Sequence, residues 1–386
     1  YRAGVNDYIK YLQNNPDKVP GEFTALGVPL REYQPWEQAA IGVFLARTVP
    51  SGDGNELTNL KLLRGANLKA LEALVPIRQP RETYTIPASE KRFPSQPGRK
   101  RSHERAAVTR SVERSKEWDL PAEPAGASTA RQGTIPLGIG RVGGSYMFAV
   151  REPGKKAVIF NGPQLGYSVP ELFVELELHY PGYDARGVTA AGVPLIAIGH
   201  NGTVAWSFTS GLSDEDDLYA EKITGAEEYE FRGEKRKMDC RDESFTFNTP
   251  LVDVAGGAQA ESGTKVERIC RTLHGPVQHR AEKTWYARRY AIWGRELETL
   301  VGLTMVAESK SVYDVDKAMN NVTWNENLMA ADSAGNIGYW HPGLHQLRPW
   351  RWDERLPYPG TGEAEWRGLL DRRRTPHVIN PKQGWL

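Results

Sequence analysis

The sequence predicts a mixed α+β fold in which a helical first part precedes a β-rich second part. Residues 1–97 carry apolar side chains at the three- and four-residue spacing of helices that bury one face. From residue 145 onward, short alternating runs separated by Gly, Asn and Pro are typical of antiparallel strands. Residues 98–144, between these parts, are rich in basic and helix-breaking residues, which favours a linker.

Helices in the first part follow from the positions of its apolar residues. The chain begins in the middle of a secondary-structure element, so we expect it to start inside a domain. The apolar face of this first helix is formed by Val5, Tyr8, Ile9 and Leu12. Pro35 occupies a favoured early position of a second helix. A third helix follows Asn55, a residue that can cap it, and its apolar stripe is Leu57, Leu60 and Leu63.

The linker differs from both flanking parts in composition. Residues 96–105 are basic and rich in helix breakers, and residues 121–134 are mostly Pro, Ala, Gly and Ser with almost no bulky apolar side chain. Such a segment cannot bury enough apolar surface to order itself. A basic arm that binds nucleic acid is an alternative, but the net charge of +1 argues against nucleic acid as the main partner.

Length and cysteine content set further bounds. A chain of 386 residues can bury a large core as one big domain or as two or three smaller ones. No stretch is long and apolar enough to span a membrane, and no signal peptide is visible. Cys240 and Cys270 lie in strand-like runs, so they either pair across a hairpin in an oxidising compartment or remain separate thiols.

The strongest chemical signal is the stretch around Ser145. Gly143 and Gly144 leave the backbone open to close approach, and an alternating apolar run follows at 146–150. If the Gly144–Ser145 bond is cleaved, Ser145 carries a nucleophilic hydroxyl and an α-amine together. That amine titrates near pH ~8 and can act as the general base without a histidine. An ordinary loop serine is the alternative.

Further motifs follow Ser145 in a fixed order. They are Asn-Gly-Pro-Gln at 161–164, Gly-His-Asn-Gly at 199–202 with Trp-Ser at 206–207, Leu-His-Gly-Pro at 273–276, and Asn-x-x-x-Ala-Asp-x-x-Gly-Asn-Ile-Gly-Tyr at 327–339. With the Gly-Ser step, this order resembles the penicillin acylase family of N-terminal-nucleophile hydrolases, and most closely its penicillin G acylase branch. The resemblance covers nearly the whole chain apart from the linker.

This resemblance implies a fold and a maturation route. The fold would be an αββα sandwich of two antiparallel sheets, incomplete at both ends in this chain. Residues 1–97 would be the C-terminal part of an α chain, residues 98–144 a spacer peptide, and residues 145–386 the N-terminal part of a β chain. Both chains would come from one zymogen that cleaves itself, and export to the periplasm or the cell exterior is implied by the same resemblance.

The resemblance also implies roles for three residues. Ser145 would be the nucleophile, Gln164 would orient its amine and the substrate amide, and the backbone N–H of Ser210 would bind the oxyanion. Cephalosporin and acyl-homoserine-lactone acylases carry histidine at the position of Gln164. A second oxyanion donor in the family is an asparagine in an Asn-Trp-Asn segment after Asn-Pro-Lys-x-Gly. Here the sequence stops soon after Asn-Pro-Lys at 380–382, so we expect the fragment to be inactive alone.

Candidate binding residues flank these positions. Leu165, Phe208 and Leu212 are candidates for an apolar acyl pocket, although each could simply belong to the core. The acidic run at 214–217 is either a solvated face or a site for a hard cation. By resemblance the cation is Ca²⁺, with Asp214, Asp217, the carbonyl of Asp216 and the carboxylate of Glu56 as ligands. No organic cofactor is expected.

Three histidines suggest other chemistry at first sight. His200, His274 and His341 show no recognised zinc-ligand spacing, and no motif supplies an Asp-His partner for a trypsin-like serine. We interpret His200 and Asn201 as residues that fix a turn. The predicted function is hydrolysis of a small-molecule N-acyl amide such as a penicillin. The alternatives are an acyl-homoserine-lactone or lipopeptide acylase of the same mechanism, and a truncated homologue that only binds.

Overall fold

The computed structural model describes residues 1–25, 27–48, 55–76, 85–86, 90, 101–122, 145–152, 154, 156–164, 171–248 and 262–386. The helices in these ranges are α1 (Arg2–Asn14), η1 (Pro16–Lys18), α2 (Gly21–Ala25), α3 (Pro35–Thr48), α4 (Glu56–Gly65), α5 (Leu68–Leu74), α6 (Arg101–Ser115), α7 (Glu298–Glu308), α8 (Val312–Ala318), η4 (Met319–Asn321) and η5 (Arg372–Arg374). None of these helices is long and apolar enough to cross a lipid bilayer.

The strands are β1 (Ser145–Val150), β2 (Val158–Pro163), β3 (Phe173–Tyr180), β4 (Tyr183–Ala190), β5 (Ile198–His200), β6 (Val204–Ser210), β7 (Asp216–Gly225), β8 (Glu228–Phe231), β9 (Glu234–Lys237), β10 (Asp239–Asn248), β11 (Ser262–Thr272), β12 (Gly275–Arg280), β13 (Thr284–Tyr290), β14 (Glu326–Asp332), β15 (Ile337–Trp340), β16 (Tyr358–Pro359) and β17 (His377–Ile379). The predicted order of helices, then mainly strands, is confirmed.

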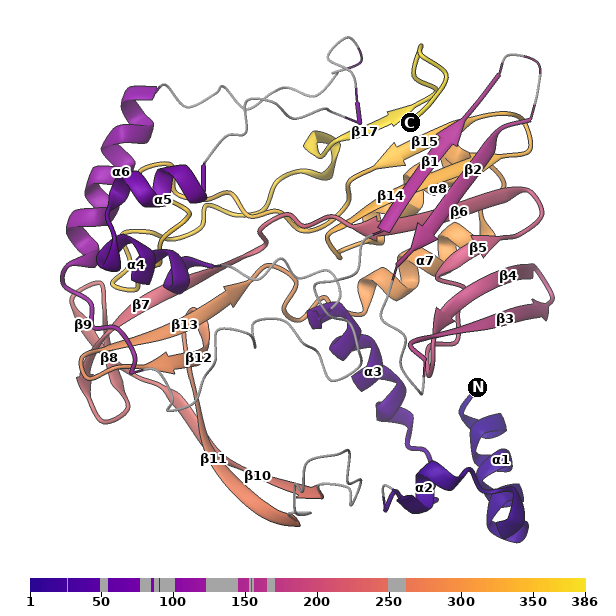
Figure 1. The fold of residues 1–386 in the computed structure, drawn as a ribbon, viewed down its shortest axis with the longest axis horizontal. Helices are drawn as coiled ribbons and strands as arrows, with labels where there is room; N and C mark the ends of the chain where they lie inside the picture. Colours follow the sequence, from indigo (N-terminus) through magenta and orange to yellow (C-terminus); the bar gives the residue numbers. More distant parts are fainter. Residues whose placement is uncertain are drawn as a thin grey trace.

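A seven-stranded antiparallel sheet forms one half of the molecule (Figure 1). Its strand order is β17-β15-β14-β6-β5-β4-β3. Side chains alternate between its two faces, as they do in any strand. On one face, Trp206 and Leu328 pack into a core that contains Leu303 of α7 and Val315 of α8. The sheet therefore has a helical layer on that face (Figure 1).

The hairpin β1–β2 covers the opposite face of this sheet. Met147, Ala149 and Ile159 point inward and share a core with Met329 and Tyr339. The remaining members of that core are Ile86, Ala157, Ala331, Ile337, Val378 and Leu386. On the outer side of the hairpin, a row of stacked rings is exposed, formed by Tyr146, Phe148 and Phe160. Helices, sheet and hairpin thus form three stacked layers.

A second, eight-stranded sheet adjoins the first. Its order is β10-β11-β12-β13-β7-β8-β9, and β16 pairs with β7 in parallel, which departs from the predicted all-antiparallel pattern. Helices α4, α5 and α6 pack near one end of this sheet (Figure 1). Their shared core contains Leu57, Leu60, Leu71, Trp118, Leu218, Ala220, Tyr286 and Leu356.

The first helices begin close to the predicted positions. Pro35 is the first residue of α3, and α4 begins directly after Asn55. Leu12, Leu57 and Leu60 are buried, as the apolar stripes predict, whereas Tyr8 is 58% exposed and its predicted place on a buried face is wrong. Asn55, however, makes no side-chain capping hydrogen bond, so its predicted capping role is wrong.

The segment after residue 98 is more ordered than predicted. Residues 101–115 form α6, whose Ala107 and Val108 are buried, and Trp118 reaches the core beneath α4. The main chain of Trp118 accepts a hydrogen bond from Arg64, and the Asp119 carbonyl accepts one from the Tyr286 hydroxyl at 2.8 Å. The prediction of an unstructured linker is therefore wrong for residues 101–119. It gave the flanking helix breakers more weight than the apolar residues of this segment. Residues 123–144 lie outside the described ranges.

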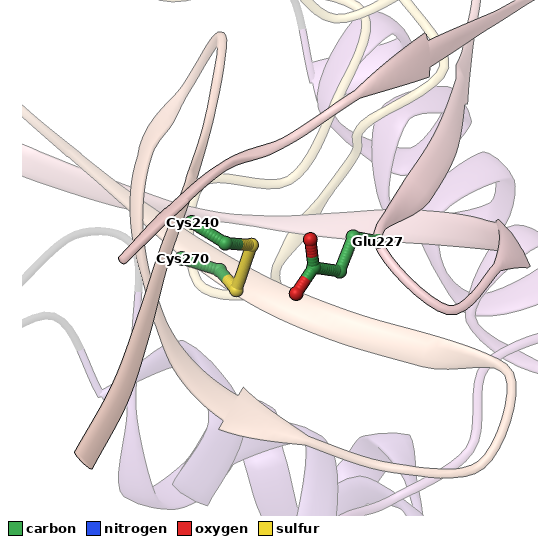
Figure 2. A group of neighbouring side chains, drawn as sticks. All are labelled: Glu227, Cys240 and Cys270. Carbon is green, nitrogen blue, oxygen red and sulfur yellow. A yellow bond between two sulfur atoms is a disulfide. The ribbon is translucent and has the colours of Figure 1, made fainter. Parts of the chain in front are cut away.

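Strands β10 and β11 form a long ribbon that extends from the second sheet (Figure 1). Cys240 and Cys270 lie directly opposite each other in this ribbon and are joined by a disulfide (Figure 2). Of the two alternatives left open by the sequence, the paired one is confirmed.

Replacing Trp118 tests whether this segment stabilises the fold. Trp118→Ala should lower the free energy of unfolding by about 3–5 kcal/mol, because it removes a large buried side chain from a shared core. Denaturant unfolding of the purified protein measures this change. Trp36→Ala is the control: Trp36 is exposed, and its loss should cost less than about 0.5 kcal/mol. Equal costs for the two variants would contradict the role assigned to Trp118.

Candidate active site

Ser145 and Gln164 lie at the same end of the β1–β2 hairpin. Ser145 is the first residue of β1 and pairs with Pro163, and Gln164 follows directly. Both side chains are exposed. All six residues of β1 pair with β2 in antiparallel orientation, and this pairing places Ser145 next to Gln164. Gly144 and Leu165 lie outside the described residues.

The orientation of β1 places Ser145 toward the end of β6 that carries Ser210. Val150, at the far end of β1, pairs with Trp385, and Ala149 exchanges hydrogen bonds of 3.1 and 2.8 Å with Leu386. The C-terminal residues reach this position by a turn from Asn380, which lies beside the first residue of β15. The opposite end of β1 therefore lies toward the Ser210–Glu326 end of strands β6 and β14, against which the hairpin packs.

The backbone N–H of Ser210 is directed away from β14. Gly211 donates a hydrogen bond of 3.0 Å to the Asn325 carbonyl across the strand pair. Hydrogen-bonded and non-bonded pairs alternate along an antiparallel ladder, so Ser210 and Glu326 form a non-bonded pair. This leaves the Ser210 amide free of the β6–β14 ladder.

Asn327 holds the residues on either side of that amide. Its Nδ2 donates to the Thr209 hydroxyl at 3.3 Å and to the Ser210 carbonyl at 3.2 Å. Its Oδ1 accepts hydrogen bonds of 2.8 Å from the Tyr339 hydroxyl and from Nδ1 of His341. A set of partly buried side chains thus fixes the backbone around Ser210, an arrangement that the sequence motif alone did not indicate.

His341 supports this arrangement as a neutral ring. Its Nε2 lies 2.7 Å from the Ser213 hydroxyl, which donates to it when Nδ1 carries the proton. Burial, together with the charge of His345, lowers the pKa of His341 to about 4. His341 is thus a structural residue of the Ser210 segment.

The other two predicted histidines have separate environments. His200 is an exposed residue of β5, whereas Asn201 organises the following turn. The Asn201 side chain accepts hydrogen bonds from the Thr203 and Val204 amides and donates 2.8 Å bonds to two carbonyls at the C-terminal end of α7, those of Ala307 and Ser309. The prediction of a turn-fixing role is confirmed for Asn201.

His274 is buried between two carboxylates. Its Nδ1 lies 2.8 Å from Glu221 and its Nε2 lies 2.8 Å from Glu365, while its ring stacks on Tyr219. Burial lowers the pKa of His274, but hydrogen bonds and attraction to both carboxylates outweigh it and the pKa is raised. The pKa of Glu365, despite burial, is lowered by His274 and Arg289. His274 therefore belongs to an ion network in the second sheet, away from Ser145.

One of the predicted pocket residues lines a cavity. Phe208 lines an apolar cavity of about 70 Å³ between the seven-stranded sheet and the helical layer. The other lining residues are Leu45, Leu172, Phe173, Thr189, Ala190, Val193, Leu195, Ala197, Leu300, Leu303 and Trp324. Leu212 is 74% exposed and is not part of this lining.

The predicted calcium ligands gather around Arg348. Its Nε lies 3.0 Å from Asp217, and its Nη2 lies 2.7 Å from the Asp214 carboxylate and 3.1 Å from the Asp216 carbonyl. The Asp216 carboxylate instead contacts Arg288. A guanidinium thus occupies the position between three of the predicted ligand groups.

Glu56 completes this acidic cluster. One oxygen accepts a 2.9 Å hydrogen bond from the Leu218 amide, and the buried second oxygen has no hydrogen-bond partner. Burial, followed by repulsion from Asp214, Asp216 and Asp217, raises the pKa of Glu56. An oxygen-rich cluster with an unsatisfied carboxylate fits a hard cation in donor type. The site would close around a cation only if Arg348 withdrew.

The ligand atoms of this cluster are not gathered to coordination distance. In the described ranges, Glu227, Cys240 and Cys270 form the one group of three such residues with ligand atoms within 4.8 Å of one another. Figure 2 shows that the two cysteines are joined as a disulfide, so they offer no thiolate. Glu227 is ion-paired with Arg268 at 2.8 Å. This group is not a metal site.

The antiparallel β1–β2 hairpin packs on one face of a seven-stranded sheet that has helices on its other face, and this layered architecture is that of the N-terminal-nucleophile hydrolase fold. The comparisons agree. The chain belongs to the penicillin amidase family, whose family model matches residues 1–386. Penicillin G acylase of Escherichia coli is 29% identical over the full chain, which spans 48% of that relative. An acyl-homoserine lactone acylase, QuiP of Pseudomonas fluorescens (strain Pf0-1), is 27% identical over the full chain and 44% of its own length.

A solved structure shares this fold. The thermostable penicillin G acylase from Alcaligenes faecalis is 30% identical, with a TM-score of 0.55 over 62% of this chain and 43% of that one. The N-terminal-nucleophile hydrolase fold predicted from the sequence is therefore confirmed. The chain spans about half the length of the curated relatives it matches.

The ion network around His274 predicts that replacing this residue lowers the free energy of unfolding by an amount that depends on pH. A raised histidine pKa stabilises the folded state fully below pH ~6.5, and this stabilisation is lost as pH rises through the folded pKa. His274→Gln should therefore lower the free energy of unfolding by about 3–5 kcal/mol at pH 5.5 and by less at pH 8.5. Denaturant unfolding at the two pH values measures the difference. His179→Gln, at an exposed site, is the control, and a pH-independent cost would contradict a charged His274.

Proposed function

We propose that this protein, in its full length, hydrolyses linear amides by removing an acyl group from a small-molecule amine through an acyl-enzyme on Ser145. The observation that carries this proposal is the convergence of the Ser145 end of β1 with the Ser210 end of β6 in a member of the penicillin amidase family. Relatives named as penicillin acylases and acyl-homoserine lactone acylases support amide hydrolysis as the shared chemistry.

In the proposed reaction, cleavage of the Gly144–Ser145 bond first exposes the α-amine of Ser145. The Ser145 hydroxyl oxygen then bonds to the substrate carbonyl carbon while its proton passes to that amine. The resulting oxyanion accepts a hydrogen bond from the Ser210 N–H. The C–N bond breaks as the leaving amine takes the proton, and water then releases the acyl group as a carboxylic acid by the same route.

Gln164 and Asn327 have supporting roles in this proposal. Gln164, at the Ser145 end of the hairpin, would orient the α-amine and the substrate amide. Asn327 would keep the Ser210 amide aimed at the oxyanion through its bonds to Thr209 and Ser210. A donor that is already aligned needs no reorganisation during the reaction, and such donors contribute roughly 2.7–4 kcal/mol in other hydrolases.

Maturation would remove a shorter spacer than the sequence predicted. Helix α6 and Trp118 contribute to the core shared with Leu218 and Tyr286, so we propose that they remain in the α chain. The removed peptide would then lie within residues 120–144. The Cys240–Cys270 disulfide supports export to an oxidising compartment, either the periplasm or the cell exterior.

Two substrate classes fit the family relatives. Phe208 and the apolar cavity support an acyl group with an apolar body, as penicillin-type amides have. N-acyl homoserine lactones are the second candidate, favoured by the QuiP relatives that match the whole chain.

Ser145→Ala in the full-length protein tests the proposed nucleophile. The wild-type precursor should yield two chains with Ser145 as a new N-terminus, whereas the variant should remain one chain and lose amide hydrolysis. Intact mass and N-terminal sequencing give the first readout, and amine release from phenylacetyl p-nitroanilide gives the second. Ser333→Ala, in an exposed turn, is the control. Normal processing and turnover by Ser145→Ala would sink the proposal.

We also propose that Ca²⁺ binds at Glu56, Asp214, Asp217 and the Asp216 carbonyl, taking the place of Arg348. The pKa of Asp214 is raised to about 6 and that of Asp217 to about 7, in both cases mainly by burial, with Arg348 lowering both. A raised carboxyl pKa means that stability falls as pH rises through this range. A bound divalent cation would relieve the repulsion between the ionised groups.

Calcium should therefore stabilise the protein in a pH-dependent way. At pH 8, where Asp214 and Asp217 are ionised, 1 mM Ca²⁺ should raise the Tm by several degrees relative to a chelator. At pH 5, where both are mostly protonated, the shift should vanish. Thermal unfolding with Mg²⁺ as the control cation measures this. An unchanged Tm at pH 8 would instead identify Arg348 as the permanent counter-charge of the cluster.

A further inference from the structure

Glu326 is a buried carboxyl group that the proposed mechanism does not use. It is the first residue of β14 and is 3% exposed. Both of its oxygens are buried without a hydrogen-bond partner, and in the described part of the chain no basic side chain forms an ion pair with it. Burial without a partner raises its pKa. Ionised, such a group is costly to keep in a core unless a partner or ligand of opposite charge joins it, so we ask which ligand could bind there.

The position of Glu326 ties it to the proposed reaction centre. It lies opposite Ser210 in a non-hydrogen-bonded pair, the arrangement in which two strands bring their residues closest, with Cα atoms ~4.5 Å apart. The side chain of Glu326 therefore starts beside the residue whose N–H is the proposed oxyanion donor.

Glu326 points to the cavity side of the sheet, which is the face opposite the β1–β2 hairpin, and it lies at the strand end toward which Ser145 is directed. The next pair along the strands is Phe208 and Leu328, and residues two apart point to the same face. Phe208 lines the cavity and is a diagonal neighbour of Glu326, with Cβ atoms roughly 7–8 Å apart. Trp324, two residues before Glu326, lines the same cavity. The carboxyl group thus lies between the cavity and the Ser210 end of the strand.

A second carboxyl group accompanies Glu326. Glu215 is 1% exposed, and neither of its oxygens has a hydrogen-bond partner of normal geometry. Burial raises the pKa of Glu215 most, and repulsion from Glu326 raises it further, more than any other charged group does. The arginines near this region are already engaged, since Arg348 contacts Asp214 and Asp217 and Arg288 contacts Asp216. Two adjacent acids without a basic partner form a site that favours a cation.

We propose that Glu326 binds an ammonium group on the acyl part of the substrate, on the carbon next to the scissile carbonyl. This inference rests on the proposed function, because Ser145 and the Ser210 N–H fix where the carbonyl lies. The substrate class is amides of apolar α-amino acids, whose side chain enters the cavity lined by Phe208 and Trp324. The amine then points toward the residue opposite Ser210, and the ion pair satisfies a carboxylate that otherwise has no partner.

A pair of substrates that differ only in the amine tests this specificity. The mature full-length protein is assayed with phenylacetyl p-nitroanilide and with both enantiomers of phenylglycyl p-nitroanilide, which add an α-amine to the same ring. We expect kcat/KM for one enantiomer to exceed that for the phenylacetyl compound by about 10- to 100-fold, the effect of one hydrogen bond to a charged group. Glu326→Gln should reduce this ratio at least tenfold while phenylacetyl turnover is kept.

Two further variants separate recognition from folding. Glu308→Gln, an acid-to-amide change at an exposed site of α7, should leave the ratio unchanged. Glu326→Leu removes the carboxyl group without leaving an amide to satisfy, and it should raise the Tm while abolishing the preference. A lower Tm for Glu326→Leu together with an unchanged substrate ratio would identify Glu326 as a structural residue and overturn the proposal.

The remaining outcomes are equally distinct. If the wild-type protein prefers the phenylacetyl compound, or prefers the matched mandelyl compound with a hydroxyl in place of the amine, the ammonium site is wrong while the amide hydrolase stands. If neither anilide is hydrolysed and Ser145 forms no acyl-enzyme, the proposed function itself has failed and the ammonium site fails with it.

Discussion

The contact between the β1–β2 hairpin and the seven-stranded sheet determines the rest of the site. Met147, Ala149 and Ile159 can reach Met329 and Tyr339 only because strand residues alternate between two faces. A shift of one residue in β1 would turn these side chains outward and bring the exposed rings of Tyr146 and Phe148 into the core. The position of Ser145 relative to β6 is therefore fixed by the packing of apolar side chains two or more residues further along the hairpin.

Polar side chains, in contrast, determine the detail at the end of β6. Asn327 orients the Ser210 segment, and His341 is held neutral by burial so that it can accept from Ser213. Close by, Glu326 and Glu215 are buried without partners. This core satisfies the groups around one backbone amide and leaves two neighbouring carboxyl groups unsatisfied, a contrast that the proposed ammonium site would explain.

Much of the fold could be predicted from the sequence, because its signals are local. The period of two around Ser145, the turn before Val204 and the apolar stripe at Leu57 and Leu60 all correspond to observed elements. Helix α6 was missed, since its few apolar residues lie between breaker-rich flanks. In the site, the motifs located Ser145, Gln164 and Ser210, but no spacing rule could show that Arg348 contacts Asp217 from 131 residues away or that Glu326 has no partner.

The core around Trp118 has a consequence for the mature molecule. It combines Leu57, Leu60 and Leu71 from before the proposed cleavage site with Leu218 and Tyr286 from after it. Once the chain is cut, these residues would belong to two polypeptides that share one interior. Unfolding would then also be dissociation, so the midpoint of denaturation would depend on protein concentration, and renaturation from separated chains would become a second-order process.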